Sequence, residues 1–275
     1  MNTIQIMELA LKLAGLDEVP EDSGILVEGE NIKKVFTGID MDTAEIMLAK
    51  QLGADLVIAH HPAAGSPRVN LHKVMVNQID RMMEAGVPIN KAQKALKEKM
   101  DEVERTLHVT NYDRAVSAAK LLGMPFMNIH TPSDIIAQRT VQEHIDKCLG
   151  DEPKAKLKDL IDCLMKLPEY KKTPAGPVIR VGSNDDYCGR IFVTMAGGTG
   201  GGVNVYKAYF EAGIGTLVVM HAKEDVIKAV KEQNIGNIVV AGHMASDSVG
   251  MNGILTKLEA RGIEVIRMAG IIDPR

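Results

Sequence analysis

The 275-residue chain carries 36 acidic and 32 basic side chains, which gives a formal net charge of −4 and a sequence pI of about 6.1. A chain of this length can bury a large core, in one domain or in two lobes. The slightly acidic balance gives no basic footprint for nucleic acid, and the absence of Trp with only four Phe argues against an aromatic platform for single-stranded nucleic acid, so we expect no nucleic-acid partner.

Targeting segments and cysteine content indicate the cellular compartment of the protein. No apolar stretch reaches the roughly 18 residues of a membrane span, and the N-terminus lacks the pattern of a signal peptide. Cys148, Cys163 and Cys188 are odd in number and have no close pairing along the sequence, which predicts reduced thiols with structural or incidental roles. We therefore expect a cytoplasmic protein that does not bind membranes.

The predicted elements follow one another as helices and strands in alternation. Helices are identified by apolar residues at helical spacing and strands by short continuous apolar runs. In chain order they are a helix at 3–16, a strand at 34–39, a helix at 43–52, a strand at 56–60, a helix at 91–107, two helices within 137–172 split near 150–153, and strands at 178–181, 190–195 and 216–220 with a helix at 203–212 between the last two.

A strand, a helix and a second strand occur in the same order in both halves, which predicts parallel pairing with right-handed crossovers in each. This pattern indicates an α/β protein with two similar lobes, each with a mixed or mostly parallel sheet flanked by helices. We place lobe one at about 1–130, a helical connection at about 131–177 and lobe two at about 178–275. Two unrelated α/β units would give the same coarse pattern.

Two adjacent histidines follow the strand at 56–60. His60 and His61 lie at the carboxyl end of that strand, where open α/β sheets bind ligands. Neighbouring side chains on an extended chain point to opposite faces, so the pair is better suited to two metal ions than to one. The alternative is a loop whose imidazoles are hydrogen-bonded or solvated.

A second strand near the C-terminus also runs into a histidine. His243 follows the apolar segment 237–242, and Asp247 lies four residues later, on the same face if the segment is helical. Between these sites the segment 108–113 ends in Asp113. Histidines and carboxylates without cysteine suit Zn, Mn, Fe, Co or Ni, so the sequence predicts a dinuclear metal centre.

Several further residues are candidates for contacts around the metals or the substrate. The glycine-rich turn at 197–202 contains Gly198, Thr199 and Gly200, and its amides suit either an anion or a tight turn with positive φ. The other candidates are Asp40, Arg68 and His221. By spacing alone, His72, His130 and His144 have no partners.

Motifs in a fixed order resemble the NGG-interacting-factor-three-like family, also known as GTP cyclohydrolase I type 2 homologues or domain of unknown function 34. The matching segments span almost the whole chain. They are EDSGILVEG at 21–29, TGID at 37–40, GADLVIAHHP at 53–62, TNYD at 110–113, AGGTGGG at 196–202 and AGHMASD at 241–247.

The resemblance implies a metal site between the two lobes with ligands at His60, His61, Asp113, His243 and Asp247. Two departures bear on that site. The family has a glutamate where this chain has Asp247, which affects metal spacing, and a histidine where this chain has Val109. The resemblance also implies a homo-hexamer.

Two functions fit these observations. In the first, the protein is a metal-dependent hydrolase acting on a phosphate-containing or nucleotide-like small molecule, similar to GTP cyclohydrolase I type 2 only through the resemblance. No catalytic base is evident. In the second, the protein is a metal-binding scaffold or metal-handling protein that acts through protein partners without turnover.

Overall fold

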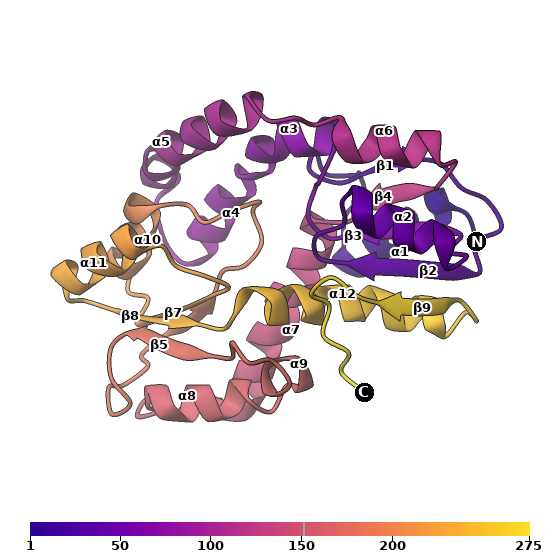
Figure 1. The fold of residues 1–275 in the computed structure, drawn as a ribbon. Helices are drawn as coiled ribbons and strands as arrows, with labels where there is room; N and C mark the ends of the chain where they lie inside the picture. The colour runs from indigo at the N-terminus through magenta and orange to yellow at the C-terminus, as the bar shows by residue number, and fades with distance from the viewer. Residues whose placement is uncertain (151) are drawn as a thin grey trace. The chain divides into compact units, whose positions relative to one another are not determined.

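The computed structural model describes residues 1–150 and 152–275, which form two sheets flanked by helices (Figure 1). The chain divides into two compact units. Unit 1 comprises Met1–Val74, Val103–Ala137 and Asp247–Asp273, and unit 2 comprises Met75–Glu102, Gln138–Ser246 and Pro274–Arg275. In the described part of the chain, none of the helices has the length and apolar character needed to cross a membrane.

The sheet of unit 1 has the strand order β1-β4-β3-β2-β9. Strands β2, β3, β4 and β9 are parallel, and the edge strand β1 is antiparallel to β4. Their bounds are Gly24–Val27 for β1, Lys34–Gly38 for β2, Leu56–Ala59 for β3, Phe126–Asn128 for β4 and Glu264–Arg267 for β9. Every residue of β3 is buried, as its continuous apolar run predicted.

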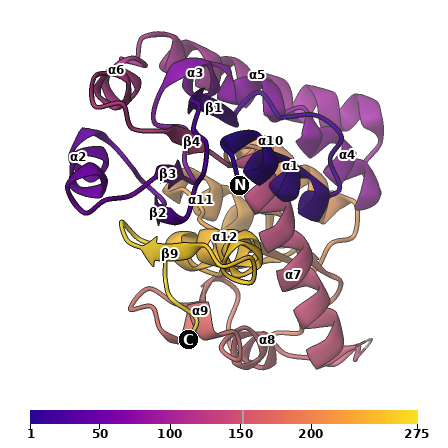
Figure 2. The same ribbon diagram turned by 90° about the vertical axis from the view of Figure 1, so that its right-hand side faces the viewer.

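Helices cover both faces of this sheet. Figure 2 shows α2 and α6 on the opposite side of β2 and β3 from α1 and α12. The helices that contribute to unit 1 are α1 (Thr3–Ala14), α2 (Thr43–Gln51), α3 (Gly65–Val74), α6 (Arg114–Leu121), and parts of α5 (Ile89–His108), α7 (Thr131–Leu149) and α12 (His243–Glu259).

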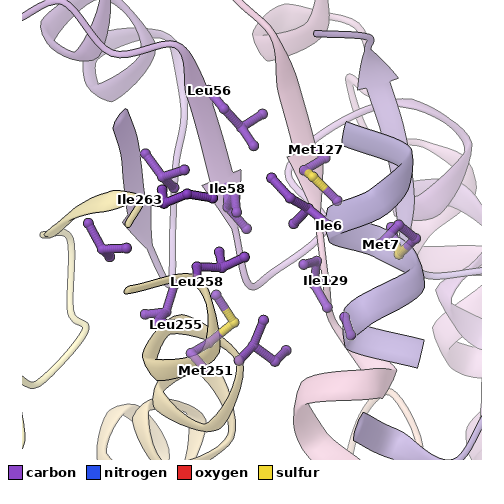
Figure 3. Close-up of a cluster of buried hydrophobic side chains, with 14 of the residues drawn as sticks. Ile6, Met7, Leu56, Ile58, Met127, Ile129, Met251, Leu255, Leu258 and Ile263 are labelled. Carbon is purple, nitrogen blue, oxygen red and sulfur yellow. The ribbon is translucent and has the colours of Figure 1, made fainter. Parts of the chain in front are cut away.

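The larger core of unit 1 packs α1 and α12 against the sheet. Figure 3 shows Ile6 and Met7 of α1, Leu56 and Ile58 of β3, and Met251, Leu255 and Leu258 of α12 converging there. Helix α1 begins at an Asn2 capping box and ends at Gly15, whose φ of 77° is a left-handed conformation that glycine adopts without strain. These contacts fix the carboxyl ends of β3 and β4 and the course of α12.

The sheet of unit 2 has the order β5-β8-β7-β6, with three parallel strands and, as in unit 1, one antiparallel edge strand. Its strands are β5 (Val178–Val181), β6 (Ile191–Val193), β7 (Thr216–Val219) and β8 (Asn237–Val240). The predicted parallel pairs are confirmed, since β2 pairs with β3 in unit 1 and β6 with β7 in unit 2. Helices wholly in unit 2 are α4 (Asn77–Glu84), α8 (Leu157–Leu164), α9 (Pro168–Lys171), α10 (Val203–Glu211) and α11 (Glu224–Gln233).

The units differ from the expected lobe boundaries because the chain returns to unit 1 at its end. Strand β9 pairs with β2, Val265 opposite Val35, so the C-terminal segment joins the first sheet and not the second. The helical stretch before β5 contains α7, α8 and the short α9 in place of two helices. The expected break at 150–153 falls partly at residue 151, outside the described residues.

Candidate metal centre

Two neighbouring parallel strands of unit 1 end in histidines. His60 follows β3 directly, and His130 follows β4 by two residues. Because β3 and β4 are parallel, with Ala59 opposite Asn128, their carboxyl ends lie at the same edge of the sheet. The rings of His60 and His130 are 4.9 Å apart between centroids, and the ring of His61 lies 5.0 Å from that of His60.

The tautomer of His60 is set by a backbone carbonyl. Its Nδ1 lies 3.1 Å from the oxygen of Ile129, and a carbonyl oxygen only accepts, so Nδ1 carries the proton. The neutral ring therefore presents a lone pair at Nε2. That atom lies 3.3 Å from Asp134 Oδ1 and 3.5 Å from Asp247 Oδ1.

The side chains that meet at His60 Nε2 are buried. The His60 side chain is 1% exposed, and Asp134 and Asp247 are also buried. Within the described chain, His60 Nε2 and Asp134 Oδ1 make no hydrogen bond. A nitrogen lone pair that faces two carboxylate oxygens in a dry site is unfavourable unless a cation or a proton lies between them.

The two carboxylates also affect the pKa of His60. Burial by itself lowers the pKa of His60, but the Asp247 and Asp134 carboxylates outweigh it and hold that pKa well above its ordinary value. Without a metal, the site thus retains a proton at the atom that a metal needs. Metal and proton compete for one position.

His61 contacts the same centre from the neighbouring position of the chain. Its Nε2 lies 3.5 Å from Asp247 Oδ2, while its Nδ1 lies 2.9 Å from Asp40 Oδ1. Burial lowers the pKa of His61 and prevails over the opposing effect of Asp40. A neutral His61 is a ready metal ligand, and Asp40 occupies the position expected of a carboxylate that orients it.

A buried aspartate orients His130. Asp22 Oδ2 lies 2.7 Å from His130 Nδ1 and accepts the hydroxyl of Thr131 at 2.8 Å. Burial alone raises the pKa of Asp22, but His130 and Thr131 outweigh it and hold that pKa below its usual value. An ionised Asp22 keeps the proton on Nδ1, which directs the lone pair of His130 Nε2 toward Asp134 Oδ2, 3.8 Å away.

The ligand atoms of this centre meet the spacing that a metal ion requires. Those of His60, His61 and His130 lie within 4.8 Å of one another, and so do those of His60, Asp134 and Asp247. We call the five residues the histidine–carboxylate centre. Nitrogen and carboxylate donors without sulfur suit Zn, Mn, Fe, Co or Ni, so the residues fit the predicted group of ions.

The predicted ligands differ in where the structure places them. His60, His61 and Asp247 lie in the centre, but Asp113 does not. Asp113 is exposed at the start of α6, and its carboxylate accepts a hydrogen bond from the Ser117 hydroxyl on the same helix. The acid that approaches His60 in unit 1 is Asp134 instead.

His243 opens helix α12, one turn before Asp247, as its spacing predicted. It is exposed, belongs to unit 2, and packs its ring 4.8 Å from that of His221. Its role as a ligand stays a prediction. Arg68 is half-buried in α3 of unit 1.

The glycine-rich turn and His221 line one cavity of unit 2, about 290 Å³ in volume. Residues 199–202 form one wall, and α10 begins at its edge with Gly202, whose φ is 83°. Gly198 also has positive φ, so the turn requires glycine for its conformation. Both expected roles of these glycines remain compatible with this geometry.

Sequence spacing missed Asp22, His130 and Asp134, and the expectation that His130 has no partner was wrong. A signal was present. His130 and Asp134 follow β4 in the segment HTPSD, just as His243 and Asp247 follow β8 in HMASD. Each segment opens a helix and places a histidine four residues before a buried aspartate.

Comparisons with known proteins identify the family of the chain. Residues 2–92 match the family model described as Duf34/NIF3 (NGG1p interacting factor 3). A crystal structure of a NIF3 superfamily protein from Sphaerobacter thermophilus is 38% identical over 98% of both chains, with a TM-score of 0.94. A search of curated proteins gave no match.

More distant structures share the fold. Reduced HcgD from Methanocaldococcus jannaschii is 14% identical with a TM-score of 0.60 over 97% of both chains. TTHA1606 from Thermus thermophilus is 16% identical with a TM-score of 0.58, over 100% of this chain and 99% of the other. With a relative of 38% identity over nearly its full length, the chain belongs to the Duf34/NIF3 family.

Proposed function

We propose that the protein is a divalent-metal-dependent hydrolase that acts on a phosphate-containing, nucleotide-like small molecule. The observation that carries the proposal is the buried His60 Nε2 atom, which lies 3.3 Å from a carboxylate oxygen of Asp134 and 3.5 Å from one of Asp247. Such a set of acceptors is what a divalent cation stabilises, and burial keeps competing water away.

We propose two ions, held by the histidine–carboxylate centre with His243 added through the family resemblance. When bound, divalent metals supply Lewis-acid polarisation of a phosphoryl or carbonyl oxygen and lower the pKa of water. The chain's own part is to orient the donors. Asp22 fixes the ring of His130, and Asp40 fixes that of His61.

The cavity of unit 2 supports the substrate class. The N-terminus of α10 opens onto it without a side-chain cap, so amides of the first turn are available to a phosphate. Lys99 and Lys223 line the same cavity, together with Glu98 and Asp225. The mixed charge favours a ligand that pairs a phosphate with hydroxyl or base donors over a bare polyanion.

Activity and metal content of the wild-type protein and two variants test the proposal. Wild-type protein loaded with Mn or Zn should hydrolyse at least one substrate among phosphomonoesters, phosphodiesters and nucleotides, GTP included. Asp247→Asn should remove both activity and metal, because this carboxylate faces His60 and His61. Asp185→Asn, an exposed acid paired with Lys156 in unit 2, is the matched control and should keep both.

Activity that persists in Asp247→Asn would belong to a contaminant or to free metal and would remove the proposal. An empty screen of a fully loaded protein would favour the second function, a metal-handling protein or scaffold. We further propose, from the family resemblance, that the protein is a cytoplasmic homo-hexamer. Light scattering should then give six times the chain mass of 29.8 kDa.

A further inference from the structure

A second cluster of metal-binding side chains lies in unit 2, apart from the residues already described. His144 and Cys148 lie one turn apart on α7, and Cys163 lies on α8. Their ligand atoms are all within 4.8 Å of one another. Spacing along the chain did not predict this group, because the two helices bring together cysteines that lie 15 positions apart.

We propose that His144, Cys148 and Cys163 bind one thiophilic divalent cation of the Zn²⁺ class, independently of the histidine–carboxylate centre. The donor set points to this class, since thiolates select soft or borderline ions while carboxylates and imidazoles alone do not. Two thiolates and one imidazole make a common zinc ligand set that leaves a fourth position open.

The spacing of the donors matches a tetrahedral ion. With Zn–S near 2.3 Å and Zn–N near 2.0–2.1 Å, a tetrahedral angle separates sulfur and nitrogen by about 3.6 Å. Cys148 Sγ lies 3.6 Å from His144 Nε2. One edge of the coordination shell is therefore already formed before an ion arrives.

The remaining contacts show which protons an ion must displace. His144 Nε2 lies 2.8 Å from the carbonyl oxygen of Cys163, so in the metal-free protein this nitrogen carries the ring proton. On binding, that proton moves to Nδ1, and the two thiols release one proton each. Burial, together with Cys148, raises the pKa of Cys163 to about 12, so an ion is needed to deprotonate it at neutral pH.

A lysine side chain contacts one of the two thiols. Lys166 Nζ lies 3.7 Å from Cys148 Sγ, and Lys166 is exposed while Cys163 is buried. The lysine side chain is long and exposed, so its ammonium can move into solvent when an ion binds Cys148. Water then has access to the fourth position.

Cobalt absorption tests the site separately from the other centre. Co²⁺ bound to thiolate gives an intense near-ultraviolet charge-transfer band that imidazole and carboxylate ligands do not give. Titration of the reduced full-length protein should produce this band and saturate it at the absorbance of one thiolate-bound Co²⁺ per chain, and Zn²⁺ should abolish it by displacement. Cys148→Ser and Cys163→Ser should each lose it.

Two control variants test whether the band comes from His144, Cys148 and Cys163. Cys188→Ser removes the third thiol, which is buried in unit 2 outside the cluster, and should leave the band intact. His60→Gln should also retain the band, because the two sites are independent. Thermal melting checks that each variant is folded. A missing band in folded wild-type protein, or a band that survives in both Cys148→Ser and Cys163→Ser, would overturn the proposal.

Discussion

Both units place histidines at the carboxyl ends of parallel strands, but the surroundings of those histidines differ. In unit 1, His60 and His130 follow β3 and β4 and are buried. In unit 2, His221 and His243 follow β7 and β8 and are exposed, with their rings 4.8 Å apart. The same strand-end pattern thus produces a dry cluster in one unit and a solvent-facing pair in the other.

Carboxylates account for the difference. Asp22, Asp134 and Asp247 are buried in unit 1 and approach His130 and His60 from a loop and from two helices. Buried carboxylates are retained at a cost in desolvation, and here each faces an imidazole that a proton or a metal can bridge. A histidine at a strand end becomes a candidate ligand when other elements bring buried acids to it.

The largest effect should come from the acid that the structure places beside His60. Asp134→Asn removes a buried charge beside His60 and should weaken binding of Mn²⁺ or Zn²⁺ by more than about 100-fold, since even residues that only orient ligands contribute about 10–100-fold. Asp113→Asn, the acid implied by the family resemblance, is exposed and should change affinity by less than about 10-fold. Calorimetric titration of both variants measures the contrast. A larger loss in Asp113→Asn would show that the resemblance identifies the ligand better than this geometry does.

The fold was largely predictable because its signal is local. The apolar run of β3 and the helical spacing of α1 are readable from neighbouring residues, and the paired parallel strands follow from their order. The return of β9 to β2 was not predictable, because it depends on a pairing between residues 34–37 and 264–267.

The histidine–carboxylate centre was only partly predictable, because only some of its residues are close to one another in the sequence. His60 and His61 are adjacent in sequence, and Asp247 follows a histidine by one turn. Asp22, in contrast, meets His130 across 108 positions of sequence, and that contact exists only once β4 has paired with β1. Residues that orient a ligand from a distant segment leave no spacing pattern.

The second prediction concerns Asp22, which contacts Nδ1 of His130 and so can only orient that ring. Asp22→Asn keeps the shape but removes the charge that fixes the His130 proton on Nδ1, so metal affinity should fall by about 10–100-fold. Asp17→Asn, an exposed acid in the same unit, should leave it unchanged. If Asp22→Asn binds metal as wild type does, His130 is not a ligand and its burial is only structural.

The third prediction is the pH dependence of the metal-free protein. The pKa of His60 is raised in the folded state, so its contribution to stability is complete below the unfolded value of 6.5 and is lost as pH rises through the folded pKa. With chelator present, the free energy of unfolding should therefore decline from about pH 6.5 upward. The pKa of His130 is also raised, so His130 adds to this decline. The pKa of His61 is lowered, so His61 makes the free energy of unfolding increase with pH below about 6.5 and does not affect it above that value.

Urea unfolding at several pH values measures this decline, and His60→Gln should flatten it. Stabilisation by added metal should show the opposite trend and increase with pH, because deprotonated His60 is the binding form. A metal-free protein that becomes more stable above pH 6.5, with the same slope in His60→Gln, would mean that His60 holds no proton in the centre.

The smallest effect should come from Asp40, which contacts His61 as Asp22 contacts His130 but lies in solvent. The distances are similar, 2.9 Å for Asp40 and 2.7 Å for Asp22, whereas the Asp40 side chain is 82% exposed and that of Asp22 is fully buried. Water screens an exposed pair and can replace the carboxylate as a hydrogen-bond acceptor. Asp40→Asn should therefore lower metal affinity by less than about 10-fold, and less than Asp22→Asn in the same calorimetric titration. Equal losses in the two variants would show that burial does not set the strength of these contacts, and that the difference between dry and solvent-facing histidines has another cause.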